Sequence, residues 1–141
     1  MGALEMIRDF VNTADFEEGR DDLADPAARE LREAIRTLLR ANNGLPVDVA
    51  GASHVLSRAA RDGDLRVAFA GGALVFESTE RILAAVAEAM ADGSWSRLKA
   101  CRSDTCQFAF VDTARNRSRT WCDMAVCGNR EKARRFRKSH A

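Results

Sequence analysis

Four cysteines arranged as two matched pairs constrain this chain more than any other feature. They stand in the last third of its 141 residues as Cys101-x4-Cys106 and Cys122-x4-Cys127, with fifteen residues between the pairs. This layout is typical of four thiolates gathered around one tetrahedral zinc ion. Because no histidine, carboxylate or open position is needed among the ligands, we predict a closed structural site with one Zn²⁺ per chain.

Disulfides and unpaired buried thiols are the alternative uses of these cysteines. The first ten residues carry acids where a signal peptide needs a charged and then apolar run, and no stretch approaches the roughly 20 apolar residues of a membrane span. We therefore expect a cytoplasmic protein without membrane contact, whose thiols stay reduced and free to bind metal. A redox pair would more typically be spaced C-x2-C.

The cysteine spacing also predicts local structure. On one continuous helix Cys122 and Cys127 would lie about 140° apart around the axis and could not face a common ion. We therefore predict that Cys122 ends a strand and that Cys127 opens a helix. The segments 108–111 and 119–121 would be the arms of a hairpin between the two cysteine pairs. This order of knuckle, hairpin and helix predicts a treble-clef-like finger, which needs zinc because few large apolar residues are available for a core.

Charge divides the chain at about the same place. Residues 97–141 contain twelve Lys or Arg and four Asp or Glu, a net charge of +8, whereas residues 1–96 carry a net charge of −7. Gly93 breaks the preceding helical pattern. We predict two domains, 1–94 and 95–141, which pack together because no long linker separates them.

The acidic part reads as a small α+β core. Asp25-Pro26 is a helix N-cap followed by a first-turn proline, and an apolar stripe runs from Leu31 to Leu39. A second helix is predicted over 47–61, and a hairpin over 65–69 and 73–76 around Gly71-Gly72. Ser78 or Thr79 would cap a third helix that carries Ile82, Leu83, Val86 and Met90 and ends at Asp92-Gly93.

The last third resembles the CGNR zinc finger family in Cys101, Cys106-Gln-Phe-Ala-Phe110, Arg119-Thr-Trp121-Cys122 and above all Cys127-Gly128-Asn129-Arg130. The acidic part resembles the ABATE domain that accompanies this finger, through Phe10-Val-Asn12-Thr13 and Leu23-Ala-Asp-Pro26. It departs from that pattern because the helix after Pro26 starts at once, where family members carry an additional helical stretch. Members are described as bacterial transcription regulators, some of them stress-induced, and RNA binding has also been suggested for the finger.

Basic residues crowd two elements beside the zinc ligands. Arginines at alternate positions of an extended segment point to one side, and we expect this arrangement at the hairpin tip. The guanidinium group of arginine is well shaped to donate hydrogen bonds to phosphate oxygens. We predict nucleic-acid contacts from Arg115, Arg117, Arg119, Arg130, Lys132, Arg134, Arg135, Arg137 and Lys138. The alternative is that these residues form ion pairs with the acidic part. Arg130 and Asn129 could also only brace or cap the zinc knuckle, and Trp121, Phe108 and Phe110 are expected in the finger core.

These features favour a DNA-binding transcription regulator whose acidic domain senses a ligand or mediates association. The same surface could bind RNA, or the finger could be a protein interaction module packed on the acidic domain. Asn12 and Thr13 could line a ligand site, although a polar turn or cap is equally consistent with them. A homodimer and a small-molecule effector are compatible with this function. We expect no enzyme, because the sequence shows no nucleophile with a base, no phosphate loop and no open metal set.

Overall fold

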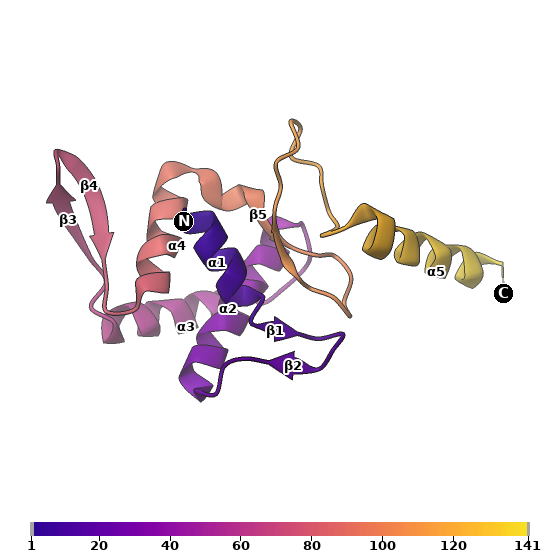
Figure 1. Ribbon diagram of the computed structural model, residues 1–141, viewed down its shortest axis with the longest axis horizontal. Helices are drawn as coiled ribbons and strands as arrows, with labels where there is room; N and C mark the ends of the chain where they lie inside the picture. The colour runs from indigo at the N-terminus through magenta and orange to yellow at the C-terminus, as the bar shows by residue number, and fades with distance from the viewer. Residues whose placement is uncertain (1, 141) are drawn as a thin grey trace.

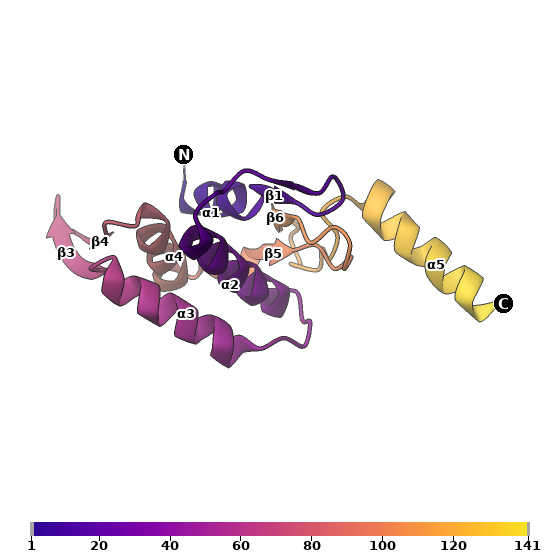
Figure 2. The same cartoon turned by 90° about the horizontal axis from the view of Figure 1, so that it is seen from below.

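The computed structural model describes residues 2–140 and is a mixed structure of helices and small hairpins (Figure 1). Four helices surround the main apolar core, with Ile7, Ile35, Leu39 and Leu98 fully buried in it. Both views place a projecting hairpin at one end of the molecule and the C-terminal helix at the other (Figures 1 and 2). The α+β class predicted from the sequence is confirmed. The helices around the core are α1 (Ala3–Val11), α2 (Pro26–Asn42), α3 (Val49–Asp62) and α4 (Arg81–Asp92).

Helix α2 begins where its capping residue predicts, and α3 begins at Val49, two residues after the predicted start. The Asp25 side chain accepts a hydrogen bond from the Ala27 N–H at 3.1 Å, and Pro26 opens the first turn of α2. The stripe from Leu31 to Leu39 is buried. Asp48 caps α3 in the same way, accepting from the Gly51 N–H at 2.9 Å. The predicted helices over these segments are confirmed.

The hairpin that follows matches the prediction, and the next helix does so apart from its cap. The predicted cap at Ser78 or Thr79 is wrong, because the N-cap residue is Glu80 and the two hydroxyls donate to the Gly63 carbonyl oxygen instead. Strands β3 (Arg66–Ala70) and β4 (Ala73–Glu77) pair antiparallel around Gly71 and Gly72, whose φ angles of 58° and 76° are those of a tight hairpin turn. Helix α4 follows and ends at Gly93, which is left-handed with φ 84°. Of its apolar residues, Ile82, Leu83 and Val86 are buried, whereas Met90 is 45% exposed.

Two elements near the N-terminus were not predicted. Helix α1 packs on α4 and buries Ile7 and Val11. It leads into a short ribbon of β1 (Ala14–Asp15) and β2 (Arg20–Asp21), whose connecting loop lies toward the start of the C-terminal helix (Figure 1).

The finger contains a hairpin, but not the predicted one. After a short 3-10 helix (Ser94–Arg97), strand β5 (Leu98–Ala100) pairs antiparallel with β6 (Ala109–Val111), so the strands flank the first cysteine pair. The described residues include no strand over 119–121, and the predicted pairing of that segment with 108–111 is wrong. The reason is the core: Leu98, Ala100 and Ala109 are buried among the helices, which makes β5 the available partner of β6.

The main core extends across the predicted domain boundary. Leu98 and Ala100 pack with residues of α1, α2 and α4, and Asn42 of α2 donates to the carbonyl oxygens of Trp95 and Leu98 at 3.0 and 2.9 Å. The division at residues 94 and 95 stays a prediction based on charge. None of the helices in residues 2–140 is long and apolar enough to cross a bilayer.

Candidate metal centre and nucleic-acid interface

The four cysteines meet at one point beside the β5–β6 hairpin. Their Sγ atoms all lie within 4.8 Å of one another, and three of the residues are buried while Cys122 is half-buried. The Sγ atoms of Cys106 and Cys122 are 3.5 Å apart, and those of Cys122 and Cys127 are 3.6 Å apart. All four are free cysteines. The predicted ligand set is therefore brought together in space.

This geometry fits one structural zinc ion. Tetrahedral coordination with Zn–S bonds of about 2.3 Å separates neighbouring sulfur atoms by about 3.8 Å. The two sulfur–sulfur distances given above are close to that value and far longer than a disulfide bond of about 2.0 Å. Cys101, Cys106, Cys122 and Cys127 would hold the ion, and zinc would tie the finger segments together.

The thiols strongly influence one another. A hydrogen bond from Cys106 lowers the pKa of Cys101 to about 5 in spite of its burial, and the same interaction raises the pKa of Cys106. Burial raises the pKa of Cys122 to about 12. Four thiolates at this separation repel one another unless a cation lies among them, which is what a divalent metal supplies.

Local contacts explain how the second cysteine pair faces the ion. The Asp123 side chain accepts from the Ala125 and Val126 N–H groups at 2.8 and 3.3 Å, which starts the π-helical turn Met124–Gly128. The wide turn brings Cys127 back toward Cys122. Cys122 itself follows an irregular segment, so the prediction that it ends a strand is wrong, whereas Cys127 does lie in the turn that opens the last helix.

A small aromatic core surrounds the cysteines. Phe110 is buried against Cys101, Cys106 and Cys127, and Phe108 and Trp121 pack on them partly exposed. This confirms the expectation that the three aromatic residues form the core of the finger. Gly128 belongs to the same packing, because a Cβ atom there would lie 3.1 Å from Cδ1 of Trp121 and would also clash with Met124.

Comparison with protein-family models matches residues 97–140 to the CGNR zinc finger. The last third of the chain is therefore similar to the CGNR zinc finger family. Its name-giving residues run from Cys127, the last zinc ligand, through Gly128 and Asn129 to Arg130 at the start of the C-terminal helix. No curated protein matches the chain. The family match covers the finger alone, so the ABATE resemblance of the preceding part stays a prediction.

The first basic element is the loop between β6 and the second cysteine pair, and a buried ion pair holds it. Lys99 on β5 donates to Asp112 Oδ2 at 2.8 Å, with side chains only 7% and 0% exposed. The Lys99 ammonium also donates to the carbonyl oxygens of Arg117 and Arg119, at 2.8 and 2.9 Å. Asp112 in turn accepts from the backbone N–H groups of Ala114 and Arg119. The loop is thus fixed from beneath.

Of the three loop arginines, two are free at the surface. Arg115 and Arg117 are exposed, and Arg117 has a φ of 54°, so the predicted extended segment with alternating side chains is wrong. Arg119 is used by the finger itself. It donates to the carbonyl oxygens of Trp121 and Cys122, and its guanidinium lies 4.7 Å from the centre of the Phe110 ring.

The second basic element is helix α5 (Asn129–Ser139), which carries the other six predicted basic residues. All six are exposed. Arg130 at its start donates to Glu17 Oε1 at 2.6 Å and to Cys127 Sγ at 3.3 Å, and these hydrogen bonds raise its pKa. Arg134 pairs with Glu131 at 3.1 Å. In residues 2–140, no ion-pair partner lies within 4.0 Å of Arg115, Arg117, Lys132, Arg135, Arg137 or Lys138.

Asn12 and Thr13 are engaged in structural contacts. The Asn12 amide pairs with both backbone polar groups of Ala109, donating to the oxygen at 3.0 Å and accepting from the N–H at 2.8 Å. Thr13 donates to the Phe10 carbonyl oxygen at 2.7 Å and accepts from Arg32 at 3.3 Å. These contacts favour the polar-cap alternative over a ligand site.

Sequence reasoning missed Glu17, Lys99 and Asp112. Nothing in the local sequence separates Lys99 from the exposed lysines, because its burial depends on the loop that folds over it. Glu17 meets Arg130 only because the β1–β2 loop reaches the finger.

Proposed function

We propose that this chain is a zinc-dependent nucleic-acid-binding protein that uses the basic end of its finger to bind DNA and regulates transcription in the cytoplasm. The observation that carries the proposal is that, among the described residues, six exposed basic residues of one loop and of α5 have no ion-pair partner. Two lie on the loop that Lys99 and Asp112 hold, and four lie on α5, which projects at one end of the molecule (Figure 1). In this proposal the acidic part supplies sensing or association, and the protein binds without catalysing a reaction.

The ion pairs between the two parts do not support the alternative in which the finger arginines hold the finger on the acidic part. Arg130–Glu17 connects a finger cation to the acidic part, and Arg40–Asp104 has the opposite polarity, with the cation on α2. Core packing of Leu98 joins the parts instead, together with hydrogen bonds that the Asn42 and Asn43 side-chain amides donate to backbone carbonyl oxygens. The free cations therefore remain available for phosphate.

A salt series tests the proposal. The zinc-loaded full chain is titrated against random-sequence duplex DNA by fluorescence anisotropy at several salt concentrations. If the six free cations neutralise phosphates, the logarithm of affinity falls with the logarithm of salt at a slope of about −5, from about −0.9 per contact. The double variant Arg115→Gln/Arg117→Gln should reduce that slope by about 2.

Arg66→Gln is the matched control, because Arg66 lies on the hairpin at the opposite end and should leave the slope unchanged. Binding that is absent or independent of salt would refute the proposal and favour a protein interaction module. Competition by structured RNA at matched salt decides between DNA and RNA.

A further inference from the structure

Helix α5 extends away from the rest of the molecule. It begins at the zinc centre and projects outward in both views (Figures 1 and 2), and among the described residues it packs mainly on the turn that precedes it. Its eleven residues span about 16 Å, and the major groove of B-DNA, about 12 Å wide, admits a helix of this kind. The shape of α5 alone does not indicate which partner it binds, whereas the order of its side chains around the helix does.

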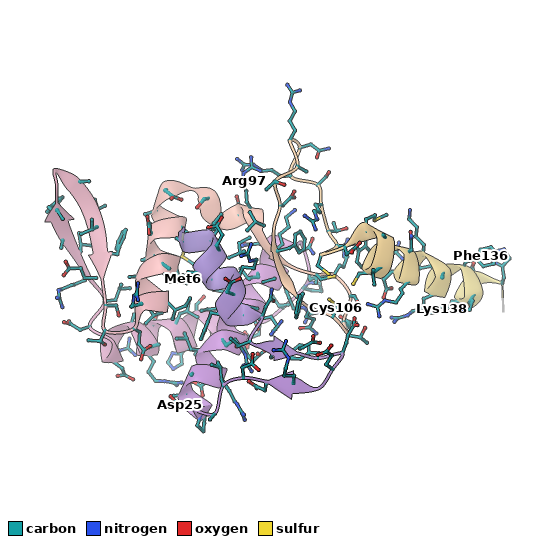
Figure 3. The ribbon with its side chains drawn as sticks, viewed as in Figure 1. Met6, Asp25, Arg97, Cys106, Phe136 and Lys138 are labelled. Carbon is teal, nitrogen blue, oxygen red and sulfur yellow. The ribbon has the colours of Figure 1, made fainter. Side chains whose placement is uncertain are left out.

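One side of α5 carries no charge. Asn129, Ala133, Phe136 and His140 follow one another at i, i+4, i+7 and i+11, which places them in one stripe along the helix, here called the neutral stripe. Phe136 is 61% exposed and stacks on His140 with ring centroids 4.0 Å apart. Figure 3 shows Phe136 at the free end of the helix, near Lys138. A large apolar side chain is therefore held at the surface of the most basic helix.

Cations border the neutral stripe on both sides. At about 100° per residue, Lys132 lies about 70° to one side of its middle and Arg137 about 70° to the other, with Arg130 next to Arg137. Glu131, the single acid of α5, lies on the opposite side of the helix and is paired with Arg134. A helix seated in a groove needs this arrangement, because the walls carry phosphates and the floor carries uncharged base edges.

We infer that α5 is the base-reading helix and that its neutral stripe contacts thymine methyl groups on the floor of the DNA major groove. Alanine and phenylalanine are the side chains that make apolar contact with that methyl group. Lys132 and Arg137 contact phosphates on the two walls. The inference rests on the proposed function, to which it adds a preference for A·T base pairs read through the methyl group of thymine.

The test removes the methyl group without changing charge or base pairing. The zinc-loaded full chain is titrated against a duplex of alternating A and T and against the same duplex with deoxyuridine in place of thymidine. The wild type should bind the thymine duplex at least about fourfold more tightly, the value of one buried methyl group. Phe136→Ala should bring the two affinities to within a factor of about 1.5, while binding to the uracil duplex changes less than twofold.

Phe69→Ala is the matched control, because Phe69 is 82% exposed on the hairpin at the other end of the molecule. It should keep the wild-type preference. Equal wild-type affinities for the two duplexes, with the salt slope intact, would overturn the inference and leave the proposed function standing. No salt-dependent binding to either duplex would defeat both. A dimer in sedimentation that Phe136→Ala converts to a monomer, without any thymine preference, would assign the neutral stripe to self-association and also overturn the inference.

Discussion

The buried pair of Lys99 and Asp112 should be among the most sensitive sites in the finger. The Lys99 ammonium uses three hydrogen bonds beneath the basic loop, and Asp112 accepts two backbone N–H groups besides Lys99. Lys99→Met leaves the Asp112 carboxylate buried without a cation and two loop carbonyl oxygens without this donor. Removal of one partner from a buried pair typically costs about 3–5 kcal/mol. This is a large fraction of the roughly 5–15 kcal/mol by which domains are stable.

Urea unfolding of the zinc-loaded protein at neutral pH measures this cost. Lys99→Met and Asp112→Asn should each lower the free energy of unfolding by about 3 kcal/mol or more, and the double variant should lose clearly less than the sum, because it leaves no unpaired buried charge. Lys132→Met is the control. Lys132 is exposed on α5 without an ion-pair partner, so its loss should stay within about 0.5 kcal/mol.

The same variants report on the loop. Hydrogen exchange of the amides over 113–119 should rise in Asp112→Asn before the rest of the protein is affected, because Asp112 holds the N–H groups at both ends of the loop. A loss below about 1 kcal/mol in Lys99→Met, or additive losses in the double variant, would refute the reasoning and show that the pair is hydrated in solution.

Three further predictions follow from the contacts described above. Chelation of zinc should unfold the finger, with a loss of α5 helicity by circular dichroism that one equivalent of Zn²⁺ restores; retention of full helicity would contradict a structural site. Glu17→Gln should strengthen binding to duplex DNA about two- to fivefold at low salt, because it releases Arg130 for phosphate, whereas Glu18→Gln should not. Arg32 donates two hydrogen bonds to Asp21, and these lower the pKa of the Asp21 carboxyl in the folded protein. The ionised Asp21 therefore stabilises the fold above the unfolded pKa of about 4, and this stabilisation is lost as the pH falls below that value. Asp21→Asn should make the stability less dependent on pH in this acid range, and an unchanged pH dependence would refute the role of Asp21.

Elements with local signals were predictable from the sequence. Asp25-Pro26 fixes the start of α2 through a cap and a proline ring, and Gly71-Gly72 fixes the β3–β4 turn through positive φ angles. The cysteine pairs belong to the same class, because two C-x4-C pairs at this separation are typical of a tetrahedral zinc site. In each case the residues that determine the structure are neighbours in the chain.

The sequence predictions failed where the residues that pack together are far apart in the chain. Helix α1 has no side-chain cap, and its stability comes from packing of Ile7 and Val11 in the core. The pairing of β6 with β5 instead of 119–121 depends on Leu98 and Ala109 being buried by helices that precede them by tens of residues.

Strand β5 explains why the finger does not behave as an appended module. Leu98 and Ala100 lie in the main core, Lys99 between them points to the other side of the strand and holds the basic loop, and the next residue, Cys101, belongs to the zinc ligands. Four consecutive residues thus connect the helical core, the loop and the metal centre. Lys99 follows Leu98 by one residue and Cys101 by three, so the packing of α1 and α2 against Leu98 gives the acidic part a physical route to the surface that we propose for DNA.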